Sequence, residues 1–242
     1  LEAQRDLFEY LNSLLRHEVL NTANTIDGYA TLLLQTHDPD AEEYQYAEVI
    51  SRQSGGLETI IEDVRSLLEI LDGTAEFEPI DLGKLLHKEK RLLESTYADA
   101  EIGIDIPGGT IVYGDSLLRR LFGNLIRNAI EHCDREDAKI EVSGSRTDDG
   151  VTITVADNGP GIPEEVQKTL FERPRKSQVN HGLGLYLVGK LTEYYGGTIE
   201  LVETGDEGTV FRLDLPVSSP NTDQEIPEIP EPSGFGLRET PR

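Results

Sequence analysis

Two asparagines in the stretch NLIRNAIEH, residues 124–132, could take part in binding a charged ligand. Asn124 and Asn128 are four positions apart, so on a helix their amides share one face. An amide oxygen can complete the shell of a magnesium ion whose other ligands are waters and triphosphate oxygens. The same spacing is also found in ordinary surface asparagines, so the stretch alone leaves both interpretations open.

A second stretch, ADNGPGIP, carries a carboxylate from the end of an expected strand into a turn. Gly159 and Gly161 would let the backbone approach a flat ligand closely. The carboxylate of Asp157 could accept a hydrogen bond from an exocyclic amine such as that of adenine. The alternative is an ordinary Asp-Asn-Gly turn.

The third stretch is a polar loop followed by the start of an amphipathic helix, HGLGLYLVGKL. Gly182 and Gly184 precede that helix, and a glycine-rich helix start can bind phosphate through backbone N–H groups and the positive helix end. The preceding loop carries Arg173, Arg175 and Lys176, a basic cluster in an acidic chain. A loop of this kind could be a lid that closes on phosphates.

A histidine near the N-terminus, in RHEVLN, is a candidate nucleophile. A neutral imidazole can attack an electrophile when a carboxylate takes its ring proton or fixes its tautomer, and Glu18 directly follows His17. Asn21 lies one helical turn further along the same face. The alternative is a plain solvated histidine on the outside of a helix.

The elements that must hold these residues begin with a helical hairpin over residues 1–72, which includes a break at Pro39. Apolar residues of both helices alternate in steps of three and four, as in a coiled coil. The stripe of the first helix is Leu15, Val19, Thr22, Ile26, Tyr29 and Leu33, and that of the second is Tyr46, Ile50, Gln53, Leu57, Ile60, Val64, Leu67 and Leu71. We expect the first helix to cover the stripe of the second, and two copies to join as a four-helix bundle, making a homodimer.

A linker over 73–80 and a second domain over 81–216 follow, with Asp81 as the N-cap of a third helix. Alternating strands are expected at 100–106, 110–114, 139–146, 150–158, 198–204 and 208–216, and helices at 116–133, near 163–171 and from 183. The overall fold class is therefore α+β, a helical hairpin followed by a two-layer sandwich. Residues 217–242, rich in Pro, Glu and Ser, are expected to be a disordered tail.

Composition narrows the classes of function. The formal net charge of −24 repels nucleic acid and anionic lipid, so we expect neither as a partner. A surplus of acid this large favours salt adaptation slightly over an ordinary acidic cytosolic domain. The single cysteine, Cys133, excludes an intrachain disulfide and favours a reducing, cytoplasmic location. No apolar run long enough to cross a bilayer is present, and the absence of methionine suggests a longer gene product with an upstream sensor region.

Taken together and in this order, the stretches resemble the boxes of two-component sensor histidine kinases from Leu1 to Pro216. LLRHEVLN is similar to the H box, NLIRNAIEH to the N box, DNGPGIP and HGLGLYLV to the two glycine boxes, and LFERPRKS, with Phe171, to the phenylalanine box. The resemblance implies the ATP-binding sandwich shared with gyrase, heat-shock chaperones and mismatch-repair ATPases. It also implies ATP and Mg²⁺ as cofactors and the receiver domain of a response regulator as a partner.

The resemblance also assigns roles to single residues. His17 would be the phosphoacceptor, Glu18 its base, and Asn21 the residue that orients water during regulator dephosphorylation. Asn128 would hold magnesium and Asp157 the adenine amine, while Asn124, Gly159, Gly161, Gly182 and Gly184 would surround the nucleotide and its lid. Because Asn124 stands where the related hydrolases carry a water-activating glutamate, the γ-phosphoryl group should be kept for His17.

The sequence departs from the family pattern, and the departures at Asn180 and Glu131 keep an alternative function open. No proline follows His17 within a few residues, Asn180 stands where a lid glycine is usual, and Glu131 replaces a usual basic residue of the N box. Arg127 and the basic cluster of the lid could supply the missing positive charge. The alternative function is a degenerate nucleotide-binding scaffold or response-regulator phosphatase. An ATP-hydrolysing machine conflicts with Asn124 and with the hairpin.

Overall fold

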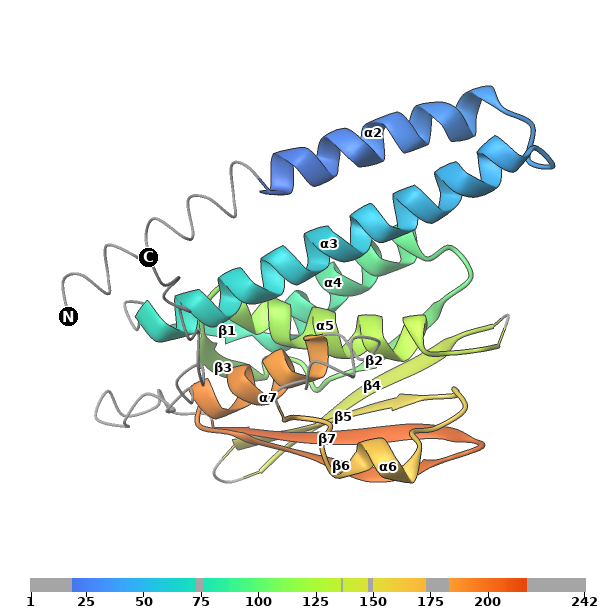
Figure 1. Cartoon of the computed structure of the whole chain (residues 1–242). Helices are drawn as coiled ribbons and strands as arrows, with labels where there is room; N and C mark the ends of the chain where they lie inside the picture. The colour runs from blue at the N-terminus through green and yellow to red at the C-terminus, as the bar shows by residue number, and fades with distance from the viewer. Residues whose placement is uncertain (1–18, 73–75, 136, 148–149, 173–182, 217–242) are drawn as a thin grey trace, which may run out of the picture.

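The computed structural model describes residues 19–72, 76–135, 137–147, 150–172 and 183–216. Its elements form three layers (Figure 1). The helical hairpin packs on a layer of helices, and this layer packs on a twisted sheet. Among the described residues, no helix is long and apolar enough to cross a membrane. The expected α+β class, a hairpin followed by a sandwich, is confirmed.

The hairpin consists of α2 (Leu20–Thr36) and α3 (Glu42–Asp72), which pack antiparallel. Small side chains fill the contact between them, because Ala23, Ala30, Ala47 and Ser54 are all buried. The Ser54 hydroxyl donates to the carbonyl oxygen of Ala23 over 3.0 Å. Small residues at these positions let the two helix backbones approach closely.

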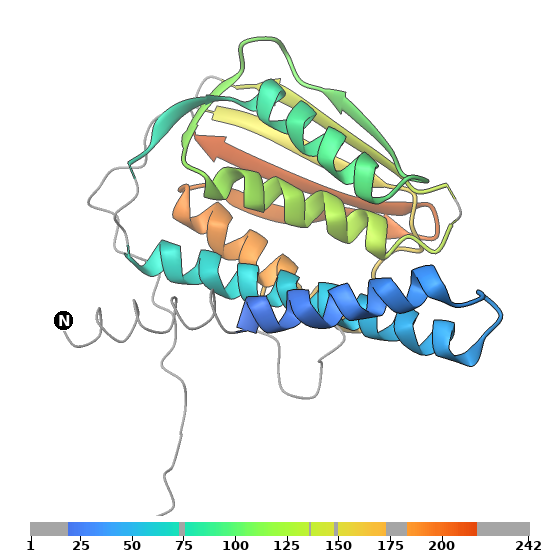
Figure 2. The same ribbon diagram turned by 90° about the horizontal axis from the view of Figure 1, so that it is seen from above.

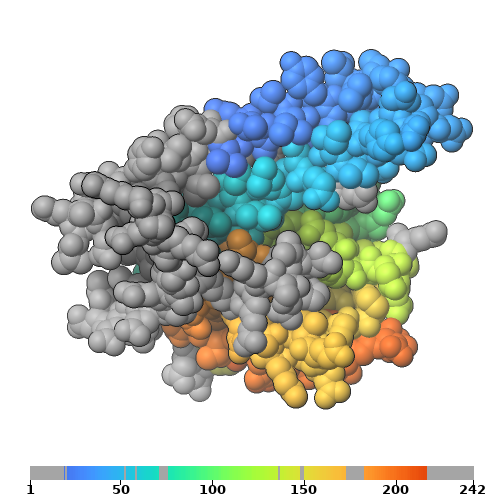
Figure 3. Space-filling view, viewed as in Figure 1, coloured from blue at the N-terminus to red at the C-terminus, as the bar shows by residue number. Residues whose placement is uncertain are grey.

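The expectation that the first helix covers the apolar stripe of the second is wrong. The small residues take the inner positions, so the large ones are turned outward on the isolated chain. Tyr29 is 69% exposed and Tyr46 59% exposed. The other exposed large apolar residues of the hairpin are Ile26, Leu32, Leu33, Val49, Ile50, Leu57 and Ile60. The loop end of the hairpin also projects beyond the rest of the molecule (Figure 3).

The sandwich is built on a five-stranded sheet in the order β2-β4-β5-β7-β6. All neighbours are antiparallel except β2 and β4, which are parallel. The strands are β2 (Glu101–Asp105), β4 (Lys139–Arg146), β5 (Gly150–Asp157), β6 (Thr198–Gly205) and β7 (Gly208–Pro216). These bounds agree closely with the expected strands.

Three helices, α4 (Leu82–Thr96), α5 (Leu117–Glu131) and α7 (Gly184–Tyr194), lie on the face of the sheet that is turned toward the hairpin (Figure 2). Their apolar faces and the inner face of the sheet form one core, in which Leu121, Leu125 and Ile126 of α5 are fully buried. The N-terminus of α4 is capped as expected, because the Asp81 carboxylate accepts from the Lys84 N–H over 3.0 Å.

Two expected segments differ from the structure. Residues Glu78–Asp81, which span the end of the expected linker and the first residue of the expected second domain, form strand β1. This strand pairs antiparallel with β3 (Ile111–Gly114) in a two-stranded ribbon. The sequence EPID lacks the alternating pattern that would indicate a strand. Pro79 is compatible with the strand because each strand of a two-stranded ribbon is an edge strand. The helix expected near 163–171 is limited to the single turn α6 (Glu164–Gln167).

Candidate nucleotide-binding site

A cavity of about 700 Å³ opens between α5, α6, α7 and the neighbouring ends of β5, β6 and β7. This volume is within the usual range for a small-molecule site. One wall is apolar, with Ile162, Val166, Leu170, Leu185 and Phe211, and the polar groups that face it include Asn128, Asp157, Thr204 and Thr209. The cavity has the composition of a site for a ligand with one flat, weakly polar part and one charged part.

Asp157 is fixed at the end of β5 by the backbone around it. Its Oδ1 accepts from the N–H of Gly159 over 2.9 Å and from the N–H of Thr209 over 3.1 Å. No described residue donates to Oδ2, which leaves that oxygen for a ligand amine. Burial raises the pKa of the carboxyl, and the two N–H groups oppose that shift. Asp157 can therefore act as a positioned hydrogen-bond acceptor.

Two glycines are required by the backbone near this carboxylate. Gly161 has φ +78°, and a Cβ there would lie 2.5 Å from the carbonyl oxygen of Gly205. Gly208 has φ +132°, and a Cβ there would overlap the carbonyl oxygen of Asp157 at 1.8 Å. Only glycine fits such positions. The turn after β5 and the start of β7 thus approach each other as closely as backbone allows.

Asn128 lines the cavity from α5, and its Nδ2 is buried without a hydrogen-bond partner among the described residues. The helix start of α7 lies against it, because a Cβ on Gly184 would lie 3.1 Å from Nδ2 and 3.4 Å from Oδ1. A buried unpaired amide is unfavourable unless a ligand or water satisfies it. Asn128 therefore fits a metal–phosphate group, while no three His, Cys, Asp or Glu side chains of the described segments form a metal cluster.

Asn124, one turn before Asn128, does not line the cavity. Its Nδ2 donates to Asp63 of α3 over 3.1 Å, and its Oδ1 accepts from Arg127. The side chain is only 2% exposed. This position differs from the expected place beside the nucleotide, because the hairpin provides a carboxylate that the sequence pattern did not associate with α5.

Charge in the cavity is unusual for an anion site. The described lining includes Asp157, Glu172 and Asp206 together with His132, and no lysine or arginine. Glu131 does not line the cavity. Instead it is exposed and accepts from the Tyr97 hydroxyl. Glu131 therefore does not contribute its charge to the lining of the cavity.

Several predicted residues cannot be compared with the cavity. His17, Glu18, Arg173, Arg175, Lys176 and Gly182 lie outside the described residues. Asn21 is exposed near the start of α2, where its carbonyl oxygen accepts from Thr25. The sequence analysis did not identify the apolar wall made by residues around α6 and by Leu185 of α7 and Phe211 of β7, because apolar residues in helices, turns and strands carry no separate signal.

The residues that form this cavity all lie inside a recognised domain. A family model described as Histidine kinase-, DNA gyrase B-, and HSP90-like ATPase matches residues 114–219. The chain is 33% identical over 210 residues to the C4-dicarboxylate transport sensor protein DctB of Rhizobium meliloti, covering 82% of this chain and 33% of that protein. It is also 26% identical over 215 residues to the sensor histidine kinase ZraS of Klebsiella oxytoca, covering 86% of this chain and 46% of that protein.

The chain is related to the sensor histidine kinases, and its residues 114–219 belong to the ATPase family that these kinases share with DNA gyrase B and HSP90. Solved structures agree with this assignment. Full-length ShkA in complex with AMPPNP has a TM-score of 0.62 at 25% identity, covering 89% of this chain and 46% of that one. The catalytic domain of the histidine kinase ThkA has a TM-score of 0.54 at 25% identity, covering 60% of this chain and all of that one. The chain spans between a third and a half of the length of these curated relatives.

Proposed function

We propose that this chain is the catalytic core of an ATP-dependent protein-histidine kinase that phosphorylates His17 and passes the phosphoryl group to an aspartate of a response regulator. One observation carries the proposal. The buried Asn128 amide, which has no hydrogen-bond partner among the described residues, and the positioned Asp157 carboxylate line the same cavity. Relatives of the chain are named sensor histidine kinases, and one similar structure contains AMPPNP.

ATP would lie with its adenine against the apolar wall, and the exocyclic amine of the adenine would donate a hydrogen bond to Oδ2 of Asp157. Mg²⁺, held by the Oδ1 of Asn128 and by phosphate oxygens, would offset the charge of the triphosphate. Because the described lining has no lysine or arginine, we expect that ion and the basic lid residues Arg173, Arg175 and Lys176 to supply most of the positive charge. Gly159, Gly161, Gly182 and Gly184 would keep side chains out of the way of the nucleotide.

Phosphorylation requires a nucleophile and a base. One ring nitrogen of His17 would attack the γ-phosphorus, the bond from that phosphorus to the bridging oxygen would break, and ADP would leave. Glu18 would take the proton from the other ring nitrogen. In the second step a regulator aspartate would attack the same phosphorus and release the imidazole. In the separate phosphatase activity, Asn21 would orient the water that hydrolyses the regulator's aspartyl phosphate.

The outward apolar face of the hairpin supports a homodimer. Ile26, Leu33, Ile50 and Leu57 are exposed on the isolated chain, although such side chains are normally buried. A second copy presents the same face, so a two-fold contact would bury both in a four-helix bundle. We expect this dimer to act in the cytoplasm, where ATP is supplied.

The test is labelling with γ-³²P ATP and magnesium, comparing the wild type with His17→Gln and Asn128→Ala. Label that is stable in alkali, labile in acid and absent from both variants supports the proposal. ATP binding without any labelled histidine refutes it and favours the nucleotide-binding scaffold or regulator phosphatase. Transfer is then followed by adding a purified receiver domain to the labelled kinase.

A further inference from the structure

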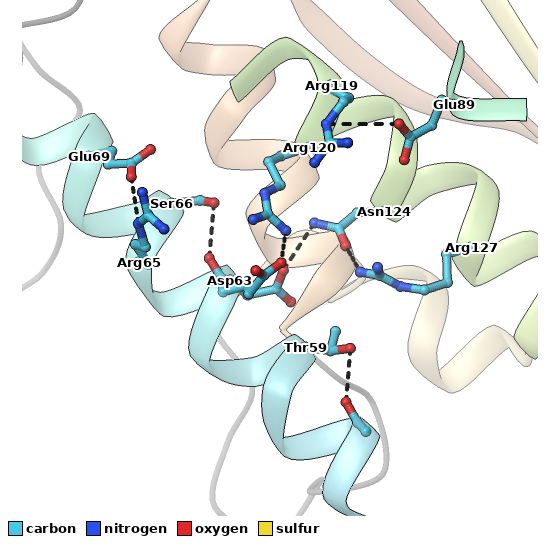
Figure 4. A network of polar contacts seen from close by, with 12 residues as sticks. Thr59, Asp63, Arg65, Ser66, Glu69, Glu89, Arg119, Arg120, Asn124 and Arg127 are labelled. Atoms are coloured by element: carbon cyan, nitrogen blue, oxygen red, sulfur yellow. Dashed lines mark hydrogen bonds and ion pairs between the residues drawn. The ribbon is translucent and has the colours of Figure 1, made fainter. Parts of the chain in front are cut away.

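Helix α5 carries polar side chains on a second face, away from the nucleotide cavity and toward α3 (Figure 4). At the centre of this contact lies Asp63 of α3, which is only 2% exposed. Its Oδ1 accepts the hydrogen bond from Asn124. A carboxylate with so little exposure is uncommon inside a helix contact, and it is satisfied here by the ATP-binding domain rather than by the hairpin.

Two arginines of α5 extend the contact on either side. Arg120 is paired with Glu62 of α3, and Arg127 donates to the Oδ1 of Asn124. Asp63, Asn124 and Arg127 therefore form one continuous chain of hydrogen bonds, in which both ends of the Asn124 amide are used. We call these three residues the α3–α5 clasp.

The chemistry of the clasp suits a contact that opens. Burial raises the pKa of Asp63, while the Asn124 hydrogen bond and the nearby charges of Arg127 and Arg120 lower it. When the two domains separate, the Asp63 carboxylate is hydrated again. This hydration offsets part of the free energy that is lost with the contact. A permanent contact between the domains would be more stable with well-packed apolar residues at this place.

The clasp also engages polar side chains of α5 that are close to Asn128 along the helix. Asn124 is one helical turn from Asn128, and Arg127 is its neighbour in sequence. In the docked arrangement Asn124 is held by Asp63 of α3, and Arg127 is held by Asn124. The charges of Asp63 and Glu62 lie on the same side of α5 as Asn124. A triphosphate bound beside Asn128 would add negative charge to a helix that already faces these carboxylates, and salt would screen the resulting repulsion.

We propose that Asp63 is a docking residue that holds the ATP-binding domain on α3 and keeps Asn124 and Arg127 away from the phosphates of the nucleotide. This inference rests on the proposed function for the identity of the ligand. It makes the docked arrangement a low-affinity state for ATP, and release from α3 the step that completes the site. The hairpin would thereby control the affinity of the domain for ATP.

The test measures docking and nucleotide affinity in the same purified proteins. Docking is followed by the distance between spin labels at Glu48→Cys on α3 and Glu165→Cys on α6, both exposed positions, in a Cys133→Ser background. Labelled chains are diluted with an excess of unlabelled chains, so that the distance is measured within one chain. Affinity is measured for ATP with magnesium and for adenosine, which has no phosphates.

Asp63→Ala should broaden the distance distribution and tighten ATP binding about fivefold or more, with little change for adenosine. Asp63→Asn should lie between wild type and Asp63→Ala, because its amide oxygen still accepts from Asn124. The control is Asp27→Ala, which removes a hairpin carboxylate that accepts from Ser51 of the same hairpin and bonds to no described residue of the ATP-binding domain. This control should leave the distance and both affinities unchanged.

An unchanged distance in Asp63→Ala overturns the inference. So does an equal change for ATP and adenosine, since that would be a general effect on the fold of the site. Phosphorylation of His17 is not needed for either readout. If no histidine is labelled while the distance and the ATP affinity change as expected, the proposed kinase activity fails and the clasp stands.

Discussion

Replacing Asp157 by asparagine should change which base the cavity accepts while preserving the loop that holds it. In the wild type, Oδ1 accepts from Gly159 and Thr209, and Oδ2 is left for a ligand. In Asp157→Asn the amide oxygen can keep both backbone hydrogen bonds. The NH₂ group then takes the place of Oδ2 and offers a donor to the adenine amine, which is itself a donor.

The size of the effect follows from one lost hydrogen bond to a charged acceptor, about 1.5–3 kcal/mol. At 1.4 kcal/mol per factor of ten, ATP should bind about 10- to 100-fold more weakly. Inosine triphosphate carries an oxygen acceptor where adenine carries its amine, so the variant should bind it more tightly than the wild type does. Calorimetric titration of both nucleotides with magnesium gives the two affinities, and their ratio should invert.

Stability provides an independent check. Burial raises the pKa of Asp157 in the folded state, so the ionised carboxyl destabilises the fold at neutral pH relative to an uncharged group. The contribution of this carboxyl is fully present below its unfolded pKa and is lost as the pH rises through its folded pKa. Asp157→Asn should therefore unfold at the same or a higher temperature than wild type at pH 7, and the difference should shrink in acid.

The reasoning is refuted if Asp157→Asn binds ATP as tightly as wild type, or if it loses both nucleotides equally while its melting temperature is unchanged. Asp157→Ala is the matched comparison. It removes the acceptor of two backbone N–H groups as well as the ligand contact, so it should lose both nucleotides and also melt at a lower temperature.

Further substitutions test other parts of the structure. Gly184→Ala should weaken magnesium–ATP binding about tenfold, because its Cβ would lie 3.1 Å from the Asn128 amide; stability should hold within about 1 kcal/mol, and calorimetry measures both. Gly208→Ala should destabilise the domain by about 3 kcal/mol or more in urea unfolding, since φ is +132° and the new Cβ meets the Asp157 carbonyl. Asp81→Ala should cost about 0.5–2 kcal/mol through loss of the α4 cap. Leu57→Glu should weaken the proposed dimer at least about hundredfold in sedimentation, because each copy loses an apolar contact.

The sandwich could be predicted closely from the sequence because its strands alternate. In β4, Ile140 and Val142 face the core and their neighbours face solvent, as the pattern of KIEVSGSR indicates. Strand β1 could not be predicted, because its four residues carry no alternation and its pairing depends on β3, more than thirty residues away. Helix α6 was overestimated since only a single turn forms there.

The hairpin and the site each show where local patterns were insufficient. Heptad spacing identified the large apolar residues of α2 and α3, but it could not indicate which of two apolar faces meets the neighbouring helix and which stays outside. Turn chemistry pointed to Asp157 and helix spacing to Asn128, and both residues line the cavity. Asn124 was misplaced relative to the cavity, because its partner Asp63 is 61 positions away and belongs to the other domain.

The hydrogen bond from Thr209 to Asp157 joins residues 52 positions apart in the chain. During synthesis at about 5–20 residues per second, the second half of this pair follows the first by roughly 3–10 s. Over that interval the nascent chain contains both asparagines and the Asp157 carboxylate, yet lacks the strand whose N–H group helps to fix that carboxylate. We therefore expect the proposed nucleotide site to form only after β7 has been synthesised. An ATP analogue added to stalled ribosome complexes of increasing length should be retained only after β7 has emerged.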